Sequence, residues 1–192
     1  MKMDMKKENI KSKILTVSNG ITTLRIIGSV ALVFLGYTSP LFIVIYTLTG
    51  LTDVLDGWIA RLTGTAGKFG ATLDSIADLL FYTVMLVKFL PVLLKTLPVE
   101  IWYGVAVVLL IRLSAYTTTA IKYHCFASLH TILNKLTGGA VFLMPYAVFL
   151  SWERVYGWIV VAIAFIASSE ELIIHLSRKS YCADVKTIFN KQ

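Results

Sequence analysis

The chain has 192 residues, of which 57% are hydrophobic and only 15% are charged, and its mean hydropathy is +0.76. Because soluble domains usually carry about 25% charged residues, this composition excludes an ordinary soluble globule and predicts an integral membrane protein. The formal net charge is +7, and lysine and arginine gather at both ends of the chain. In a membrane protein, basic ends indicate orientation and contact with anionic lipid. No nucleic-acid-binding motif accompanies them, so we expect no nucleic-acid partner.

The first 17 residues form a basic segment with an amphipathic pattern. Five lysines lie within it, and a helix over residues 5–17 would place Ile10, Ile14 and Leu15 on one side. A basic amphipathic helix beside a membrane span typically lies in the membrane surface. We therefore expect residues 1–17 to form a surface helix ahead of the membrane domain.

Six apolar stretches follow, each close to the 20 residues that a helix needs to cross a bilayer core of about 30 Å. They cover approximately residues 20–37, 40–62, 70–92, 100–122, 132–151 and 156–177. We predict an all-α integral membrane domain of six transmembrane helices over residues 18–178, with a cytosolic tail over residues 179–192. Most positive charge lies on the side of both termini, which places both termini in the cytosol. The expected location is the cytoplasmic membrane.

A polar motif opens the first predicted span. It reads Asn19-x-x-Thr22-x-x-Arg25 and lies near the cytosolic face. Its polar groups could reach a nucleotide or a phosphate group. The equally weighted alternative is a helix cap at Asn19 and an Arg25 side chain that extends to the membrane surface.

An aspartate block lies at the end of the second predicted span and the start of the third. It reads Asp53-x-x-Asp56-Gly57-x-x-Ala60-Arg61, then eight residues, then Gly70-x-x-x-Asp74-x-x-x-Asp78. A charged side chain inside a membrane helix costs roughly 2.5–3.5 kcal/mol on insertion scales. Four clustered carboxylates therefore indicate a functional site, and their mutual repulsion calls for a cation. The alternative is that the four aspartates only cap helix ends or face solvent.

Helical geometry predicts that these carboxylates converge. At 100° per residue, the block residues of the second span share one face, and Asp74 and Asp78 share a face of the third. A short turn joins the two spans, so they must be adjacent and antiparallel, with all four aspartates within roughly 14 Å of the turn. Oxygen ligands suit Mg²⁺, Mn²⁺ or Ca²⁺ rather than zinc. Arg61 suits phosphate contact, so the block predicts phosphate or pyrophosphate chemistry on a membrane-bound substrate.

The aspartate block resembles the signature of the CDP-alcohol phosphotransferases at every fixed position, and the motif from Asn19 to Arg25 resembles the first-helix pattern of that family. The resemblance implies metal-dependent transfer of a phosphatidyl group from CDP-diacylglycerol to a small alcohol, with release of CMP, by an enzyme of phospholipid synthesis. It also implies a homodimer.

The resemblance also assigns roles to single residues. It implies Asp53, Asp56, Asp74 and Asp78 as ligands of Mg²⁺ or Mn²⁺, in a site for two ions, with Asp78 also the general base. The residues implied to contact the CDP moiety are Asn19, Thr22, Arg25, Gly57, Ala60, Arg61 and Gly70.

The acceptor alcohol is less sharply specified. Arg112, Lys122 and Lys135 lie on or near the cytosolic parts of the fourth and fifth spans, where similar family members hold an acceptor phosphate. This favours glycerol 3-phosphate and a weak resemblance to phosphatidylglycerophosphate synthases. Those enzymes typically carry proline after the third aspartate and lysine after the fourth, where this chain has Ser75 and Leu79. Serine and inositol phosphate therefore stay open as acceptors.

Two further points remain open at the level of sequence. A metal or ion transporter is the alternative from another class, although its acidic residues would line a path near the membrane midplane. Glu170 and Glu171, in the last predicted span, have no role that the sequence explains.

Overall fold

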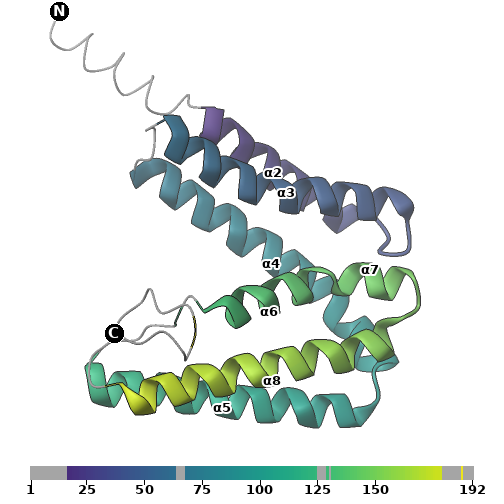
Figure 1. Cartoon of the computed structure of the whole chain (residues 1–192). Helices are drawn as coiled ribbons and strands as arrows, with labels where there is room; N and C mark the ends of the chain where they lie inside the picture. Colours follow the sequence, from purple (N-terminus) through teal and green to yellow (C-terminus); the bar gives the residue numbers. More distant parts are fainter. Residues whose placement is uncertain (1–16, 64–67, 125–128, 130, 179–186, 188–192) are drawn as a thin grey trace, which may run out of the picture. The chain divides into compact units, whose positions relative to one another are not determined.

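The computed structural model describes residues 17–63, 68–124, 129, 131–178 and 187. Regular structure in this part is entirely α-helical, without a strand. The helices are α2 (Val17–Phe34), α3 (Pro40–Thr63), α4 (Lys68–Thr96), α5 (Val99–Tyr123), α6 (Ile132–Phe142), α7 (Met144–Phe149) and α8 (Glu153–Ser177) (Figure 1). The predicted surface helix and almost all of the predicted tail lie outside the described residues.

Four segments are long and apolar enough to cross a membrane. They are Thr72–Thr96, Val99–Tyr123, Ile132–Phe149 and Glu153–Ser177. Each coincides with one of the last four predicted spans, which confirms an all-helical chain of membrane character. Helices α2 and α3 coincide with the first two predicted spans, but their apolar described parts, Asn19–Phe34 and Pro40–Asp53, are shorter. The arrangement of six transmembrane helices therefore stays a prediction.

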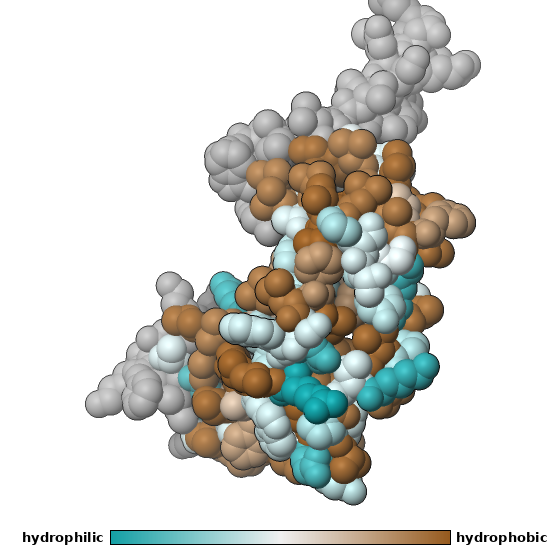
Figure 2. Space-filling view, turned by 90° about the vertical axis from the view of Figure 1, so that its right-hand side faces the viewer, coloured by the Kyte–Doolittle hydropathy of each residue, from teal (hydrophilic) through white to brown (hydrophobic). Residues whose placement is uncertain are grey.

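The surface of the helices is rich in large apolar side chains. Phe34, Leu79 and Ile121 are each at least 70% exposed, and many other leucine, isoleucine and valine side chains are exposed as well. Figure 2 shows hydrophobic side chains spread widely over the face that it presents. Extended exposed apolar surface is unfavourable in water, so contact with lipid is its natural explanation.

The chain divides into two compact units, Met1–Val92 and Leu93–Gln192. The boundary falls inside α4, next to Pro91. Proline has no backbone N–H and so cannot donate the helical hydrogen bond to the carbonyl of Val87. The helix continues through this position to Thr96 with one hydrogen bond fewer.

In the first unit, α2 and α3 run antiparallel and pack closely (Figure 1). A glycine permits the close approach. A Cβ atom built on Gly28 of α2 would clash with the Oγ1 atom of Thr49 on α3, and it would lie 3.4 Å from the Cβ atom of Thr49. Thr49 is buried, so little free space surrounds this contact.

Aromatic packing attaches α4 to α3 in the same unit. The rings of Tyr46 and Phe81 stack with centroids 5.6 Å apart, and those of Phe42 and Phe89 lie 5.7 Å apart. Such ring pairs add about 0.5–1.5 kcal/mol beyond the area that they bury. Lys88 of α4 donates a hydrogen bond to a backbone carbonyl in the α2–α3 connection. These contacts fix the face of α4 that carries the aspartates against α3.

In the second unit, α5 packs along α8, and α6 and α7 also contact α8. Gly157 of α8 is buried, and a Cβ atom there would lie 3.0 Å from the Cδ1 atom of Ile101 on α5. Within the predicted fifth span, α6 and α7 are separated only by Leu143, whose backbone dihedral angles stay close to helical. Pro145 cannot donate a backbone hydrogen bond into the preceding turn, which explains the break.

Candidate functional site

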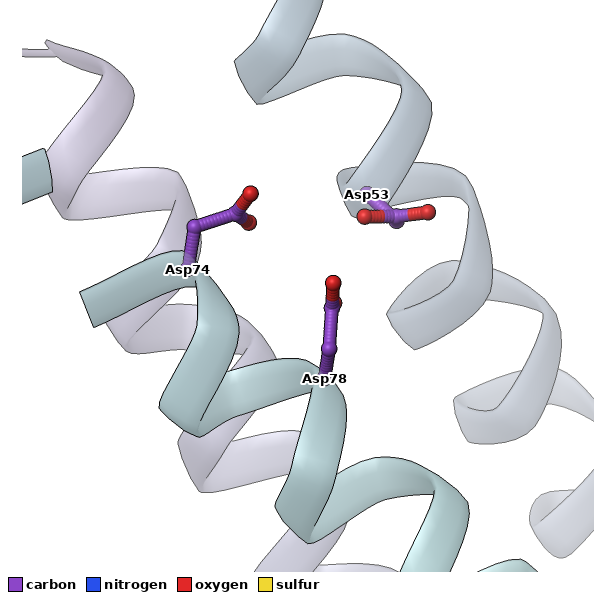
Figure 3. Close-up of side chains that lie close together, drawn as sticks. All are labelled: Asp53, Asp74 and Asp78. Atoms are coloured by element: carbon purple, nitrogen blue, oxygen red, sulfur yellow. The ribbon is translucent and has the colours of Figure 1, made fainter. Parts of the chain in front are cut away.

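Three aspartates converge from two helices of the first unit. Asp53 projects from α3, and Asp74 and Asp78 project from one face of α4 (Figure 3). One carboxylate oxygen from each lies within 4.8 Å of the others. The spacing of four residues puts Asp74 and Asp78 one turn apart. The predicted convergence of the block is therefore present for these three residues.

Arg25 of α2 lies at the centre of this group. Its Nη1 atom is 2.6 Å from Oδ1 of Asp78, 2.8 Å from Oδ1 of Asp74 and 3.0 Å from Oδ1 of Asp53. It donates hydrogen bonds to Asp74 and Asp78. The arginine is only 1% exposed, whereas the three carboxylates are between 37% and 46% exposed. A buried guanidinium requires compensating charge, and the three carboxylates supply it.

The rest of the α2 motif lies on the same buried side of the helix. Asn19, Thr22 and Arg25 recur every three residues, and all three are buried. A Cβ atom on Gly70 of α4 would lie 2.9 Å from the Oδ1 atom of Asn19. The structure thus brings the first-helix motif beside the aspartate block. The alternative of an Arg25 side chain extending to the membrane surface is wrong, because its guanidinium is buried among carboxylates.

The remaining predicted residues of the block lie in the C-terminal half of α3. Asp56, Gly57, Ala60 and Arg61 belong to the helical backbone of α3, but their side chains lie outside the described part of the structure. Their assignment to metal and CDP therefore stays a prediction.

The described residues fit a hard divalent cation. Carboxylate oxygens are the preferred ligands of Mg²⁺ and Ca²⁺, and opposite ligands of a Mg²⁺ ion lie about 4.2 Å apart. The three oxygens, all within 4.8 Å of one another, match this size. Three carboxylates and one guanidinium leave a formal charge of −2, which one divalent ion would neutralise. Which ion binds, and how many, stays a prediction.

Comparison with known proteins identifies the family. The sequence profile of the CDP-alcohol phosphatidyltransferases matches residues 15–169, which is most of the chain and includes the whole site. The chain belongs to the CDP-alcohol phosphatidyltransferase family. Members of this family are transferases of substituted phosphate groups.

Two curated relatives of this phosphatidyltransferase-family chain differ in their named acceptor. It is 40% identical over 72 residues to a CDP-diacylglycerol–serine O-phosphatidyltransferase of Methanocaldococcus jannaschii, and the matched residues make up 38% of this chain and 33% of the relative. It is 36% identical over 78 residues to a CDP-diacylglycerol–glycerol-3-phosphate 3-phosphatidyltransferase of Cereibacter sphaeroides, which covers 38% and 35% respectively. The chain thus matches about a third of the length of each relative. No solved structure matches it significantly.

The three predicted acceptor-binding residues lie in the second unit of this family member. Arg112 donates from Nη2 to the Oδ1 atom of Asn134 at 3.1 Å. Lys122 donates from Nζ to the backbone carbonyls of His175 and Leu176, at 2.9 Å each, near the C-terminal end of α8. Lys135 is exposed. Arg112 and Lys122 thus have structural partners, and acceptor binding by the three stays a prediction.

A buried carboxylate that the sequence left unexplained has a structural role. Glu171 of α8 is 1% exposed and accepts hydrogen bonds from the backbone N–H of Leu129, at 3.0 Å, and from Nδ2 of Asn134, at 2.9 Å. It therefore holds the start of α6 against α8. It also fixes the amide of Asn134, whose other end faces Arg112. The helical spacing of Glu171 from the apolar residues Ala167 and Ile174 could have indicated that it faces inward, but not which partners it has.

Proposed function

We propose that the protein transfers a phosphatidyl group from CDP-diacylglycerol to a small alcohol and releases CMP. The convergence of Asp53, Asp74 and Asp78 around Arg25 carries this proposal, because it combines metal-ligand oxygens with a phosphate-binding cation. The family match supports the reaction class. The names of both relatives specify CDP-diacylglycerol, which supports the donor.

The proposed chemistry divides the work among residues of three helices. Asp53, Asp56 and Asp74, with Asp78 as a further ligand, would hold Mg²⁺ or Mn²⁺, which neutralises charge on the diphosphate when bound. Asp78 accepts the proton of the acceptor hydroxyl at a carboxylate oxygen. The acceptor oxygen attacks the phosphorus on the lipid side, the bond from that phosphorus to the bridging oxygen breaks, and CMP leaves with the bonding electrons. Positioning and charge neutralisation account for most of the rate enhancement in such transfers.

Binding of the nucleotide is assigned to small and polar residues around the carboxylates. Gly57 and Ala60 leave room for the CDP moiety to approach the backbone of α3, and Arg61 pairs with its phosphates. The buried side of α2 and the glycine opposite it complete the site. These residues are Asn19, Thr22, Arg25 and Gly70.

We propose glycerol 3-phosphate as the acceptor, held by Arg112, Lys122 and Lys135, with serine and inositol phosphate as alternatives. The two relatives are named for serine and for glycerol 3-phosphate, so they support the class of small polar acceptor. The charge distribution supports a cytoplasmic membrane enzyme with the site and both termini in the cytosol. We also propose that it acts as a homodimer.

An acceptor panel tests this proposal. The detergent-purified protein is supplied with CDP-diacylglycerol, Mg²⁺ and one of glycerol 3-phosphate, serine, inositol, inositol phosphate or no acceptor. CMP release is measured, and the lipid product is identified by mass spectrometry. One acceptor is expected to stimulate CMP release and to appear in the lipid. CDP-diacylglycerol binding is measured in parallel. A protein that binds CDP-diacylglycerol but releases no CMP with any of these acceptors would contradict the proposal.

A further inference from the structure

The position of Arg25 coincides with the position that a metal ion would take. One atom, Nη1, lies within 3.0 Å of the Oδ1 atoms of all three aspartates. A divalent ion bound by the same three oxygens would lie about 2.0–2.6 Å from each of them, depending on the metal. Both positions are equidistant, or nearly so, from the same three atoms. On its side of the three oxygens, the nitrogen therefore fills the place that the ion would take.

Electrostatics also opposes their joint occupancy. Two cations a few ångströms apart in a partly buried site repel strongly, because the local dielectric screens them less than water does. The guanidinium itself is almost fully buried, so little solvent separates it from the carboxylates. A metal bound by these oxygens and an Arg25 paired with them are thus alternative arrangements of the site.

We propose that Arg25 is a built-in counter-cation that competes with the divalent metal for Asp53, Asp74 and Asp78. Binding of the metal displaces the guanidinium from the carboxylates, and the displaced group pairs with the diphosphate of the nucleotide. This second step rests on the proposed function, whereas the competition does not. Arg25 thereby couples metal binding to nucleotide binding. In the absence of metal, its positive charge offsets the electrostatic repulsion among the three carboxylates.

Metal binding without substrate tests the competition. The variant Arg25→Gln is compared with the wild type by Mn²⁺ titration in detergent, read by electron paramagnetic resonance. We expect the variant to bind Mn²⁺ about tenfold more tightly or better, within the usual range of coupling between two linked ligands. Equal or weaker binding by Arg25→Gln would overturn the proposal. Because no nucleotide or lipid is present, this outcome is independent of whether the protein is a transferase.

Stability provides a second readout that a purely structural arginine would not produce. In EDTA, Arg25→Gln should unfold more easily than the wild type, because three carboxylates lose their counter-charge. At saturating Mn²⁺ the difference should shrink or vanish, by thermodynamic linkage with the tighter metal binding. A loss of stability that is equal with and without Mn²⁺ would overturn the proposal. Should Arg25→Gln not fold, Arg25→Met, which also removes the charge and keeps a long side chain, takes its place in the comparison.

Lys88→Gln is the matched control for charge. It removes one positive charge from the same unit at a position ten residues along α4 from Asp78, about 15 Å away along the helix axis. We expect it to leave Mn²⁺ affinity unchanged and to alter stability equally with and without the metal. Soluble CDP tests the second step. It should raise the Mn²⁺ affinity of the wild type more than that of Arg25→Gln, and an equal effect would refute the pairing with diphosphate.

Discussion

The tight contact between Gly28 of α2 and Thr49 of α3 can be tested by adding one methyl group. Gly28→Ala places a Cβ atom against Oγ1 of Thr49 and 3.4 Å from its Cβ atom. Gly20→Ala, on the same helix, is the matched control, because nothing lies within 4 Å of a Cβ atom there. Both changes gain helix propensity, at most about 1 kcal/mol in a helix interior, so most of this gain cancels in the comparison. The remaining difference is the cost of overpacking, typically 1–3 kcal/mol.

The assay is reversible unfolding in mixed micelles, with increasing dodecyl sulfate and circular dichroism as the signal. We expect Gly28→Ala to have a free energy of unfolding about 1–3 kcal/mol below that of Gly20→Ala. Thr49→Ala removes the clashing atoms, so in that background the difference should nearly disappear. Equal stability of the two glycine variants would refute the reasoning. A stability difference between them that persists in the Thr49→Ala background would refute it as well.

The same contact is close to the site. Arg25 precedes Gly28 by three residues, and Asp53 follows Thr49 by four, so each lies about one helical turn from the contact. A separation of the two helices here should also move Asp53 away from the other two carboxylates. We therefore expect Gly28→Ala, but not Gly20→Ala, to weaken Mn²⁺ binding.

Three other changes have defined outcomes. Asp74→Asn should weaken Mn²⁺ binding by more than the roughly 10–100-fold that loss of a group supporting a metal ligand costs. The control variant Ile76→Ala, at an exposed neighbouring position, should bind Mn²⁺ with wild-type affinity. Wild-type Mn²⁺ affinity of Asp74→Asn would show that Asp74 is not a ligand. Glu171→Ala should lower the free energy of unfolding by about 2–6 kcal/mol, because Leu129 and Asn134 each lose a buried acceptor worth about 1–3 kcal/mol. A change below about 1 kcal/mol in the micelle assay would mean that neither donor depends on Glu171. EDTA should abolish CMP release and added Mg²⁺ should restore it, whereas release that continues in EDTA would exclude a metal requirement.

The convergence of the aspartates could be predicted because it depends on local geometry. Asp74 and Asp78 are one turn apart on a single helix, and a short connection forces the neighbouring helix to return beside it. The position of Asp53 could be predicted by the same helical spacing, which places it on one face of the neighbouring helix with the other residues of the block. The structure confirms the proximity of these three side chains, while the sequence alone was sufficient to expect it.

The role of Arg25 could not be predicted in the same way. Its partners are 28, 49 and 53 residues further along the chain, and their approach depends on how α2 packs against α3 and α4. The motif on α2 was equally consistent with a surface-directed arginine. Burial of the guanidinium argues against the surface-directed arginine, and burial is a property of packing rather than of local sequence. Contact of Arg25 with a nucleotide stays a prediction.

Glu171 and the break at Leu143 illustrate two other limits. The partners of Glu171 include a backbone N–H, which any residue could supply, so no side-chain pattern identifies it. The break at Leu143 follows from Pro145, which is visible in the sequence, but hydropathy alone reports apolar length and not the loss of a backbone hydrogen bond. The predicted span over residues 132–151 is confirmed as an apolar segment long enough to cross a membrane, and only the local irregularity at Leu143 was not predicted.

The most direct measurement is Mg²⁺-dependent CMP release from CDP-diacylglycerol by the wild type and by Asp78→Asn, made with the acceptor that the panel identifies. CDP-diacylglycerol binding by both proteins is measured alongside. We expect the wild type to release CMP and the variant to lose about 10²–10⁴-fold in rate, the usual contribution of a general base, while still binding the lipid nucleotide. A variant that releases CMP at the wild-type rate would contradict the assignment of the site.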